Sequence, residues 1–177
     1  MKVRAKGKSA RSSVSPSLLL RPLAPSDLAA VTALIGRTID TAYPPHYGPG
    51  CIAHFKEHHS EANILKDAAE GYCVVAEEDG AIVGTGTLTG AHVRRVFVEP
   101  FCQRRGIGRA IMRDLEARAA ASGAALVDLA SVLGSRAFYE ALGYVVRELK
   151  CHVLPDGEKM RFYFMTKLLL PIARPIP

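Results

Sequence analysis

A strand, a glycine-containing turn and an amphipathic helix follow one another directly between residues 92 and 122, and they constrain the fold more than any other part of the chain. Residues 92–98 are predicted as a strand that ends before Pro100. Residues 108–122 are predicted as a helix that Gly123 closes. A strand that enters a helix through so short a turn places the helix against the face of a sheet. The helix face that would pack there carries an apolar side chain every four residues: Ile107, Ile111, Leu115 and Ala119.

The rest of the chain alternates between strand and helix patterns around this unit. Asp79-Gly80 is a strong hairpin signal between apolar runs at 72–77 and 81–89. We predict further strands at 18–22, 125–130, 144–154 and 161–169, a helix that Ser26 or Asp27 caps, a loop at 41–50, a helix over 52–69 with a possible break near Ser60, and a short helix at 135–142. The expected fold class is therefore mixed α/β (α+β), with a central, mostly antiparallel sheet of about seven strands and flanking helices.

Length and charge indicate how the chain is organised. Its 177 residues fit one domain, and no apolar run approaches the roughly 20 residues of a membrane-spanning helix. The net charge of +6 is concentrated at one end, because residues 1–15 carry five basic and no acidic side chains. We expect a basic, disordered arm at 1–16, a single domain at 17–170 and a frayed, Pro-rich end at 171–177. The arm lacks aromatic residues for base stacking, which argues against specific nucleic-acid binding. A cytoplasmic protein without a membrane partner is expected.

A histidine motif indicates a second enzyme class. His54, Glu57 and His58 match the His-x-x-Glu-His pattern of inverted zinc peptidases, in which both histidines share one helix face. A third ligand cannot be identified in the sequence, so zinc peptidase activity stays a remote alternative. The four cysteines are widely separated and include no Cys-x-x-Cys pair. We therefore predict no metal site.

The turn between the strand and the helix has the properties of an anion-binding site. A helix N-terminus presents unpaired N–H groups and the positive end of the helix dipole. Gly106 can take a positive φ, and Gly108 allows the first helical turn to lie close to a ligand. The arginines that would lie beside this ligand are Arg104, Arg105 and Arg109. A phosphate site is one interpretation of this pattern, and a solvated basic face is the other.

Two further segments decide between these interpretations. Arg95–Pro100 precedes the turn Gln103–Gly108, and Phe138–Tyr144 follows it later in the chain. In this order and spacing the three segments resemble the GNAT superfamily of N-acetyltransferases. The resemblance covers roughly residues 18–169, and its specific part lies between 92 and 144. It implies an enzyme that moves an acetyl group from acetyl-CoA to a primary amine by direct attack in a ternary complex.

The resemblance also implies where coenzyme A binds. In this family the strand before the turn splays away from a parallel neighbour, here residues 92–98 and 125–130, and the pantetheine arm lies between the two strands. Backbone groups of the first strand would bind pantetheine, and amides of the turn would bind the pyrophosphate. The residues expected to bind the cofactor are Val96, Phe97, Val98, Gln103, Arg104, Arg105, Gly106, Ile107, Gly108, Arg109, Ser135 and Tyr139.

Two side chains are candidates for acid–base catalysis. Tyr139 occupies the position where the family usually places the proton donor for the departing thiolate, and its alternative is a core aromatic role beside Phe138 and Tyr144. His92 lies where several members carry a catalytic glutamate. Imidazoles ordinarily have a pKa of about 6.5, which suits a base, and a chain of water molecules is the alternative. Ser135 replaces an asparagine of many relatives, and a role as helix cap is favoured over one in binding pantetheine.

The acceptor is expected to bind between Tyr43 and His59. The candidate acceptor-binding residues are Tyr43, His46, Tyr47 and Phe55, a mixture that favours a small polar amine over a polyamine. A protein N-terminus, a lysine, an antibiotic and an amino acid remain open as acceptors. The sequence also leaves open whether the donor carries an acetyl or a longer acyl group. It does not decide whether the protein forms a homodimer through edge strands. The alternative function is a non-catalytic coenzyme A sensor or interaction module of the same fold.

Overall fold

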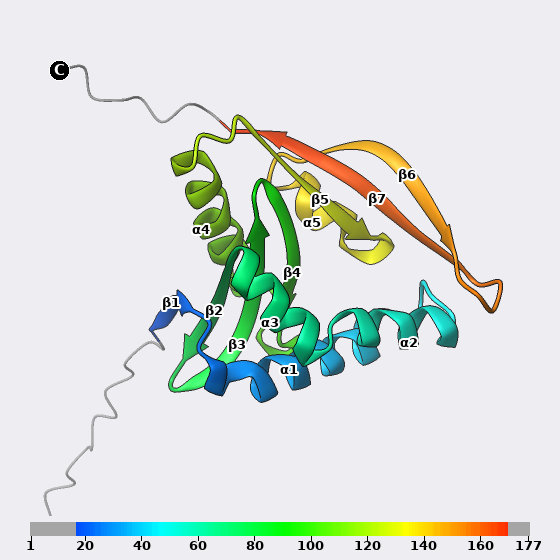
Figure 1. Ribbon diagram of the computed structural model, residues 1–177, viewed down its shortest axis with the longest axis horizontal. Coiled ribbons are helices and arrows are strands. Elements are labelled where there is room, and N and C mark those ends of the chain that lie inside the picture. Colours follow the sequence, from blue (N-terminus) through cyan, green and yellow to red (C-terminus); the bar gives the residue numbers. More distant parts are fainter. Residues whose placement is uncertain (1–16, 170–177) are drawn as a thin grey trace, which may run out of the picture.

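The computed structural model describes residues 17–169, and within them seven strands and five α-helices form the fold (Figure 1). The predicted arm at 1–16 and the predicted frayed end at 171–177 lie outside the described residues. The strands are β1 Leu18–Pro22, β2 Tyr72–Glu78, β3 Ala81–Thr89, β4 His92–Val98, β5 Leu126–Val132, β6 Val145–Val153 and β7 Lys159–Leu168. The α-helices are α1 Leu28–Ala42, α2 Pro49–His58, α3 Glu61–Glu70, α4 Ile107–Ala121 and α5 Arg136–Glu140. Short 3₁₀ turns occupy Pro25–Asp27, Pro100–Cys102 and Leu133–Ser135.

All seven strands belong to one sheet, in the order β1-β2-β3-β4-β5-β7-β6. Every neighbouring pair is antiparallel except β4 and β5, which are parallel. That pair is joined only at its beginning, where His92 lies opposite Asp128 and Val93 opposite Leu129. Beyond these residues the two strands part. The predicted sheet, mostly antiparallel with one splayed parallel pair, is thus confirmed.

The parting of β4 from β5 begins at an irregularity in β4. The register between β3 and β4 shifts between Thr85 and Thr87. Two residues of β4, Arg95 and Val96, therefore lie opposite one residue of β3, which is a β-bulge. Arg95 has a φ of 54°, in the left-handed region that non-glycine residues rarely adopt. Because a bulge bends its strand and increases the twist, it accounts for the separation of the two strands.

Buried charges anchor this bulge to α3. The Arg95 guanidinium pairs with Asp67 and donates a hydrogen bond to the His58 carbonyl at 3.0 Å, and its side chain is only 3% exposed. Arg94 pairs with the same Asp67 at 3.0 Å. Burial lowers the pKa of Arg95 to about 10, which leaves the guanidinium charged at neutral pH. The conformation of β4 is thus held by an ion cluster on the face opposite α4.

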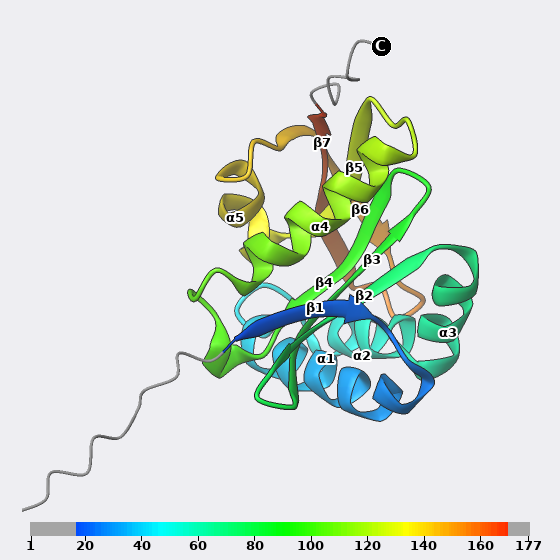
Figure 2. The same cartoon turned by 90° about the vertical axis from the view of Figure 1, so that its left-hand side faces the viewer.

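The sheet separates two hydrophobic cores (Figure 2). The helix α4 covers one face, and its predicted apolar stripe is entirely buried. Helices α1 and α3 cover the other face, where Leu34 and Ile64 pack in one core with Val75. Val74, the preceding residue of β2, belongs to the core under α4. Successive residues of β2 therefore point to opposite faces, as expected for a strand covered on both sides.

The first helix begins differently from the prediction. Residues 25–27 form a 3₁₀ turn before α1, and no side chain caps α1 itself. The Asp27 carboxylate accepts the N–H of Ala24 at 2.7 Å and pairs with Arg21 at 2.6 Å. The predicted capping of α1 by Ser26 or Asp27 is therefore wrong, and the Asp27 carboxylate instead makes a capping-box contact at the start of the 3₁₀ turn.

The predicted helix at 52–69 consists of two helices that separate at His59 and Ser60, close to the expected break. The first of them, α2, begins three residues early, within the predicted loop at 41–50. Pro49 occupies its first position, where the fixed φ of proline suits a helix and the missing N–H has no cost. None of the described helices is long and apolar enough to cross a membrane.

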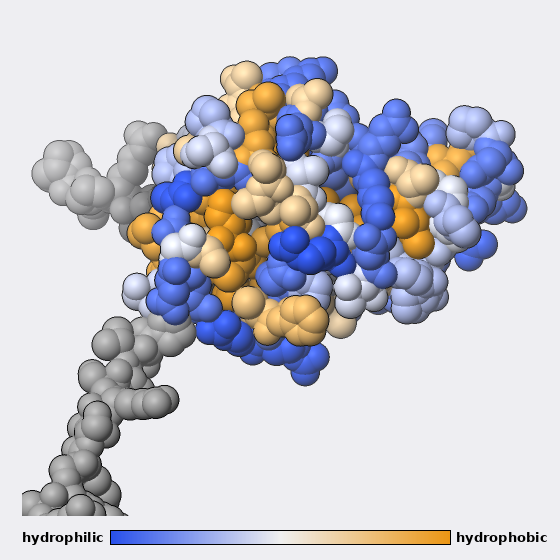
Figure 3. Space-filling model, turned by 90° about the horizontal axis from the view of Figure 1, so that it is seen from below, coloured by the Kyte–Doolittle hydropathy of each residue, from blue (hydrophilic) through white to orange (hydrophobic). Residues whose placement is uncertain are grey.

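The β6–β7 hairpin projects from the sheet and reaches the start of α2 (Figure 1). Glu158 lies in the hairpin turn, directly before β7. Its carboxylate accepts hydrogen bonds from the backbone N–H groups of Gly50 and Cys51, both at 2.9 Å. A carboxylate in this position satisfies amides that have no partner within the helix and complements the helix dipole. Seen from below, hydrophilic residues surround smaller hydrophobic areas toward this projecting end (Figure 3).

Candidate functional site

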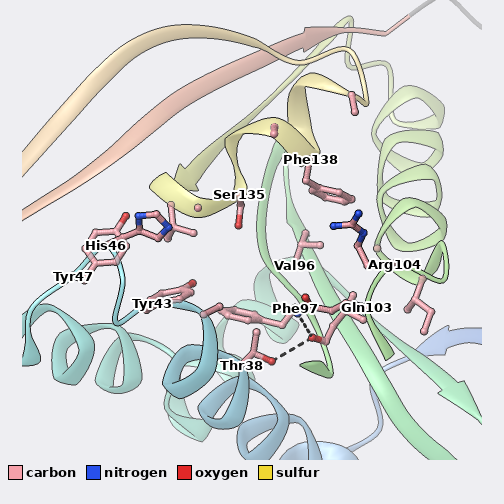
Figure 4. Close-up of a pocket in the computed structure, with 18 residues that line it drawn as sticks. Thr38, Tyr43, His46, Tyr47, Val96, Phe97, Gln103, Arg104, Ser135 and Phe138 are labelled. Carbon is pink, nitrogen blue, oxygen red and sulfur yellow. Dashed lines mark hydrogen bonds between the residues drawn. The ribbon is translucent and has the colours of Figure 1, made fainter. Parts of the chain in front are cut away.

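A cavity of about 730 Å³ opens where β4 and β5 part (Figure 4). Its walls come from the end of α1 and the following loop, from β4, from the turn before α4, and from the segment that joins β5 to α5. The cavity brings together the predicted residues Tyr43, His46, Tyr47, Val96, Phe97, Val98, Gln103, Arg104, Ile107, Gly108 and Ser135. The predicted residues that do not line it are Phe55, His92, Arg105, Gly106, Arg109 and Tyr139.

The end of β4 presents a backbone edge to this cavity. On one side, Phe97 and Val98 pair with β3. On the other side, β5 pairs only with the beginning of β4. Within residues 17–169, the edge of 96–98 that faces β5 therefore has no strand partner. Such an edge offers the N–H and C=O groups that an extended amide chain requires.

Two polar side chains hold the end of this strand. The Val98 carbonyl accepts a hydrogen bond from the Gln103 amide at 3.1 Å, and it shares the Thr38 hydroxyl, at 3.3 Å, with the Leu34 carbonyl, at 2.9 Å (Figure 4). Gln103, which is expected to bind a cofactor, lines the cavity and also bonds its amide to the strand. Thr38 is a cavity residue that the sequence did not indicate, because a threonine within a helical pattern carries no functional signal.

The turn before α4 is shaped to expose backbone N–H groups. Arg104 and Gly106 both have a positive φ, of 65° and 86°. Gly106 is the N-cap of α4, and no described side chain caps the helix. The backbone N–H of Ala110 donates the first hydrogen bond of the helix, to the Gly106 carbonyl at 2.9 Å. The N–H groups of the residues before Ala110 therefore have no acceptor within the helix. The helix N-terminus therefore presents N–H groups of the kind that bind anions.

Only one of the three arginines predicted to surround the turn faces the cavity. Arg104 points into it from the side of α4 (Figure 4). Arg105 pairs with Glu78 of β2 at 2.8 Å, and Arg109 is exposed outside the cavity. The expected contribution of Arg105 to ligand binding is not supported by this placement, because its guanidinium is already occupied.

Phe138 forms the wall of the cavity next to α4. A Cβ atom on Gly108 would lie 3.1 Å from Cζ of Phe138, so the absence of a side chain at Gly108 lets the ring approach the turn. The expected site residue of this pair is Tyr139, and it is Phe138 that lines the cavity. The pattern could not separate these neighbours, because a helix of five residues is too short for its period to indicate which residue faces inward.

Tyr139 lies behind Phe138 in the hydrophobic core. Its ring centroid is 5.0 Å from that of Phe138 and 5.8 Å from that of Tyr144. Burial raises the pKa of the Tyr139 hydroxyl. The pKa of Tyr43, which lines the cavity, is raised by burial and further by the nearby hydroxyls of Tyr139 and Tyr47. Tyr139 is therefore close to the cavity without forming its wall.

His92 lies at the closed end of the parted strands, outside the cavity. Its Nδ1 is bonded to Oδ1 of Asp128 in the neighbouring strand. Val98, at the cavity end of β4, is six residues away, which is roughly 20 Å along an extended strand. This placement argues against the expected role of His92 as a base, because a base must be within hydrogen-bond reach of the proton that it removes.

Aromatic residues after α1 form the wall opposite α4. Tyr43, His46 and Tyr47 line the cavity, as predicted for an acceptor side. Phe55 stands behind them, with its ring centroid 4.9 Å from that of Tyr43 and 5.1 Å from that of Tyr47. Phe55 thus supports the wall and is not part of its surface.

Hydrogen bonds tie this wall to the rest of the cavity. The Tyr47 hydroxyl donates to the Arg161 carbonyl of β7 at 2.7 Å and accepts the N–H of Leu133 at 3.0 Å. Ser135, two residues further on, lines the cavity (Figure 4) and makes no side-chain cap to α5. The favoured role of Ser135 as a helix cap is therefore wrong, and its position fits the alternative role in ligand binding.

The zinc-peptidase alternative finds no support in this arrangement. Within residues 17–169, no group of three or more histidine, cysteine or acidic side chains is placed to hold a metal ion. The His54 ring lies 6.2 Å from that of His152, centroid to centroid, and His58 contributes its carbonyl to Arg95.

Comparison with known proteins adds a family and a shared fold. Residues 43–157 match a family described as "Acetyltransferase (GNAT) domain". No curated protein matches the chain. A solved structure of a GCN5-related N-acetyltransferase (aminotransferase, class-II) from Rhodopseudomonas palustris is similar, with 25% sequence identity, a TM-score of 0.79, and coverage of 85% of this chain and 95% of the other.

Two further solved structures contain a cofactor. The PaiA N-acetyltransferase from Thermoplasma acidophilum, in complex with coenzyme A, is 16% identical, with a TM-score of 0.66 and coverage of 86% of this chain and 99% of that one. YncA from Salmonella typhimurium, solved with its cofactor acetyl-CoA, is 18% identical, with a TM-score of 0.62 and coverage of 90% and 98%. At these identities the similarity shows a common fold.

Proposed function

The chain belongs to the GNAT acetyltransferase family, and we propose that its cavity holds acetyl-CoA along the end of β4 and acetylates a small primary amine. Family membership makes the protein an acyltransferase that uses acetyl-CoA as donor. The observation that supports the proposed placement is the continuity of two features within one cavity. The backbone edge of residues 96–98, which has no strand partner on the β5 side, leads to the open N-terminus of α4.

The donor half of the cavity fits the parts of coenzyme A. The backbone of Val96 and the N–H of Val98 would bind the pantetheine arm, which is an extended chain with amides, while Gln103 and Thr38 hold the Val98 carbonyl. The amides of residues 104–109 and the Arg104 guanidinium would bind the pyrophosphate. Phe138 would cover the arm beside Gly108, and Ser135 would offer a hydroxyl to it.

When bound, acetyl-CoA supplies an acyl thioester that an amine can attack. Backbone N–H groups near Val98 are the proposed donors to the negative charge that develops on the acyl oxygen. The aromatic wall of Tyr43 and Tyr47 would hold the acceptor and exclude water from it.

Tyr139 stays the proposed proton donor for the sulfur that leaves. Its proximity to Tyr43 supports this role, and the raised pKa keeps its hydroxyl protonated at neutral pH. Tyr139→Phe should lower kcat by about 10²-fold or more without changing acetyl-CoA affinity. Tyr144→Phe is the matched control, because it removes a hydroxyl from the same aromatic cluster. Similar small losses in both variants would show that Tyr139 serves packing alone.

The acceptor is proposed to be an amine without a second cationic group. No carboxylate is among the described residues that line the cavity, so a polyamine would find no partner for its other charges. The wall of Tyr43, Tyr47 and Phe97 favours an apolar or aromatic substituent near the amine. A panel of aromatic monoamines, amino acids, peptides and polyamines, incubated with acetyl-CoA and followed by mass spectrometry, tests this. A higher kcat/KM for spermidine than for a matched monoamine would contradict it.

The donor site is tested without an acceptor. Isothermal titration calorimetry should show acetyl-CoA binding that Gly106→Ala weakens, because alanine is strained at a φ of 86° and would alter the backbone conformation of the turn. Gly157→Ala, at a φ of 85° in the distant β6–β7 turn, is the matched control. Equal affinity in both variants would refute the proposed placement of the pyrophosphate.

Two finer proposals concern the environment of the protein. A cytoplasmic location is proposed on the sequence grounds given above, and cell fractionation tests it. A homodimer through β6 is supported by its position at the edge of the sheet, where Val145, Leu149 and Val153 are each more than half exposed. Light scattering after size-exclusion chromatography measures the mass, and a monomer at all concentrations would contradict the dimer.

A further inference from the structure

The cavity wall contains very few groups that could remove a proton from an amine. An amine acceptor is largely protonated at neutral pH and cannot attack until it loses that proton. The titratable side chains that line the cavity are Tyr43, His46, Tyr47 and Arg104. No carboxylate is among the described lining residues, and His92 lies outside the cavity.

Three of these four groups are unsuited to the task. Burial raises the pKa of Tyr43 and of Tyr47, so both phenols stay protonated at neutral pH. The Tyr47 hydroxyl is also committed to the Arg161 carbonyl and the Leu133 amide. Arginine stays protonated at any pH at which the enzyme works. His46 is the remaining group, and histidine is the side chain that ordinarily changes charge between about pH 5 and 8.

The fold places the His46 imidazole at the acceptor side. The His46 backbone N–H donates to the Tyr43 carbonyl at 2.9 Å, which fixes the turn that carries it. Across the cavity, a Cβ atom on Gly134 would lie 2.9 Å from Nε2 of His46. In this position the exposed ring lies against Gly134, next to Ser135 (Figure 4), and a side chain at 134 would have to displace it.

We propose that His46 is the base that takes the proton from the acceptor ammonium. This inference rests on the proposed function. The ammonium gives one proton to the imidazole, and the freed nitrogen lone pair forms the bond to the acetyl carbon. The carbon–sulfur bond breaks with its electron pair on sulfur, the second proton of the nitrogen ends on that sulfur, and the imidazolium returns its proton to solvent. The products are the acetylated amine, coenzyme A as a thiol and one proton.

Variants of three residues test the proposal with an acceptor from the amine panel. His46→Gln keeps a polar side chain of similar size and should lower kcat by about 10²-fold or more. It should also remove the acidic limb of the pH–rate profile and leave acetyl-CoA affinity unchanged. His152→Gln, in the exposed part of β6, is the matched histidine control and should keep the wild-type profile. Gly134→Ala should displace the His46 ring and lower kcat at unchanged acetyl-CoA affinity. The φ of Gly134 is not in the left-handed region, so alanine should not strain the backbone there.

A second readout does not depend on turnover. In protein with ¹⁵N-labelled histidine and bound coenzyme A, addition of the acceptor amine should shift the His46 ring resonances. The signals that disappear in His46→Gln identify the His46 ring resonances. The ring resonances of His152 should not shift when the amine is added. Ring resonances that do not respond to the amine would overturn the proposal.

The results separate the proposal from the function on which it rests. A wild-type protein that neither binds acetyl-CoA nor acetylates any amine would refute both. A wild-type enzyme whose rate and acidic limb survive His46→Gln would refute only the role of His46. Loss of the acidic limb in His92→Gln instead would assign the base to His92 and overturn this inference.

Discussion

Removal of Asp67 should destabilise the fold and distort the donor half of the cavity. Asp67 pairs with Arg94 and Arg95, and the Arg95 side chain is 3% exposed. Asp67→Ala would leave the Arg95 guanidinium charged and buried, with only the His58 carbonyl as a partner. Breaking a buried ion pair by removing one partner costs about 3–5 kcal/mol. The Arg94 pair is 30% exposed on the arginine side and adds at most about 1 kcal/mol.

This loss is large compared with the stability of an ordinary domain, about 5–15 kcal/mol. It corresponds to a fall in melting temperature of about 6–20 °C for a domain of this size. Urea unfolding followed by circular dichroism measures the free energy of unfolding, and calorimetry measures acetyl-CoA affinity. Affinity should fall as well, because Arg95 lies at the bulge that separates β4 from β5.

A double variant distinguishes the burial of a charge from a loss of packing. Asp67→Leu combined with Arg95→Met replaces the pair by apolar side chains and should recover most of the stability lost in Asp67→Leu alone. Lys56→Ala, which breaks the exposed pair with Asp40, is the control and should change stability by less than about 1 kcal/mol. If Asp67→Ala costs no more than Lys56→Ala, the ion cluster does not hold the bulge.

Further predictions concern the two ends of the cavity. Arg104→Ala should weaken acetyl-CoA binding and reduce its dependence on salt, whereas Arg105→Ala should do neither, because Arg105 pairs with Glu78; equal losses in calorimetric titrations would contradict this. Glu158→Gln should raise the acceptor KM at unchanged acetyl-CoA affinity, because Glu158 joins the β6–β7 hairpin to the start of α2, which follows the loop of the acceptor wall. An unchanged KM would show that these two hydrogen bonds do not shape the acceptor wall. Hydrogen bonds from the N–H groups of Cys51 and Gly50 lower the pKa of Glu158. The contribution of these bonds to stability is therefore present above pH 4.5, the ordinary pKa, and is lost as pH falls through the lowered pKa of the folded state. Unfolding curves of wild type and Glu158→Gln should therefore converge in acid.

Regular elements were predictable from the sequence because their signals are local. The strand at 81–89 and the strand at 92–98 were predicted at their observed bounds, since Asp79-Gly80 and Gly90 mark the turns around them. The glycine-containing turn likewise indicated an open helix N-terminus. These features follow from the conformational preferences of a few consecutive residues.

The misplaced site residues depended on contacts between distant segments. Arg105 carried the right charge for a phosphate, but Glu78 of β2 holds it. His92 had suitable chemistry, but the end of β4 where it stands is the end joined to β5. Phe138 and Tyr139 could not be separated, because the side that faces the cavity depends on how α5 packs against the sheet. Sequence spacing contains no record of these pairings.

The two halves of the cavity are held by different parts of the fold, which explains why one half was easier to recognise. The donor half is built by the β4 bulge and the start of α4, which follow each other in the chain, so their signals form one recognisable stretch. The acceptor half is held by contacts between segments far apart, such as that of Tyr47 with Arg161. Its residues can therefore change without altering the donor half. If the proposed acceptor side is correct, such a separation would let one donor site serve different acceptors, and the loop that carries His46 would be the segment to exchange in testing it.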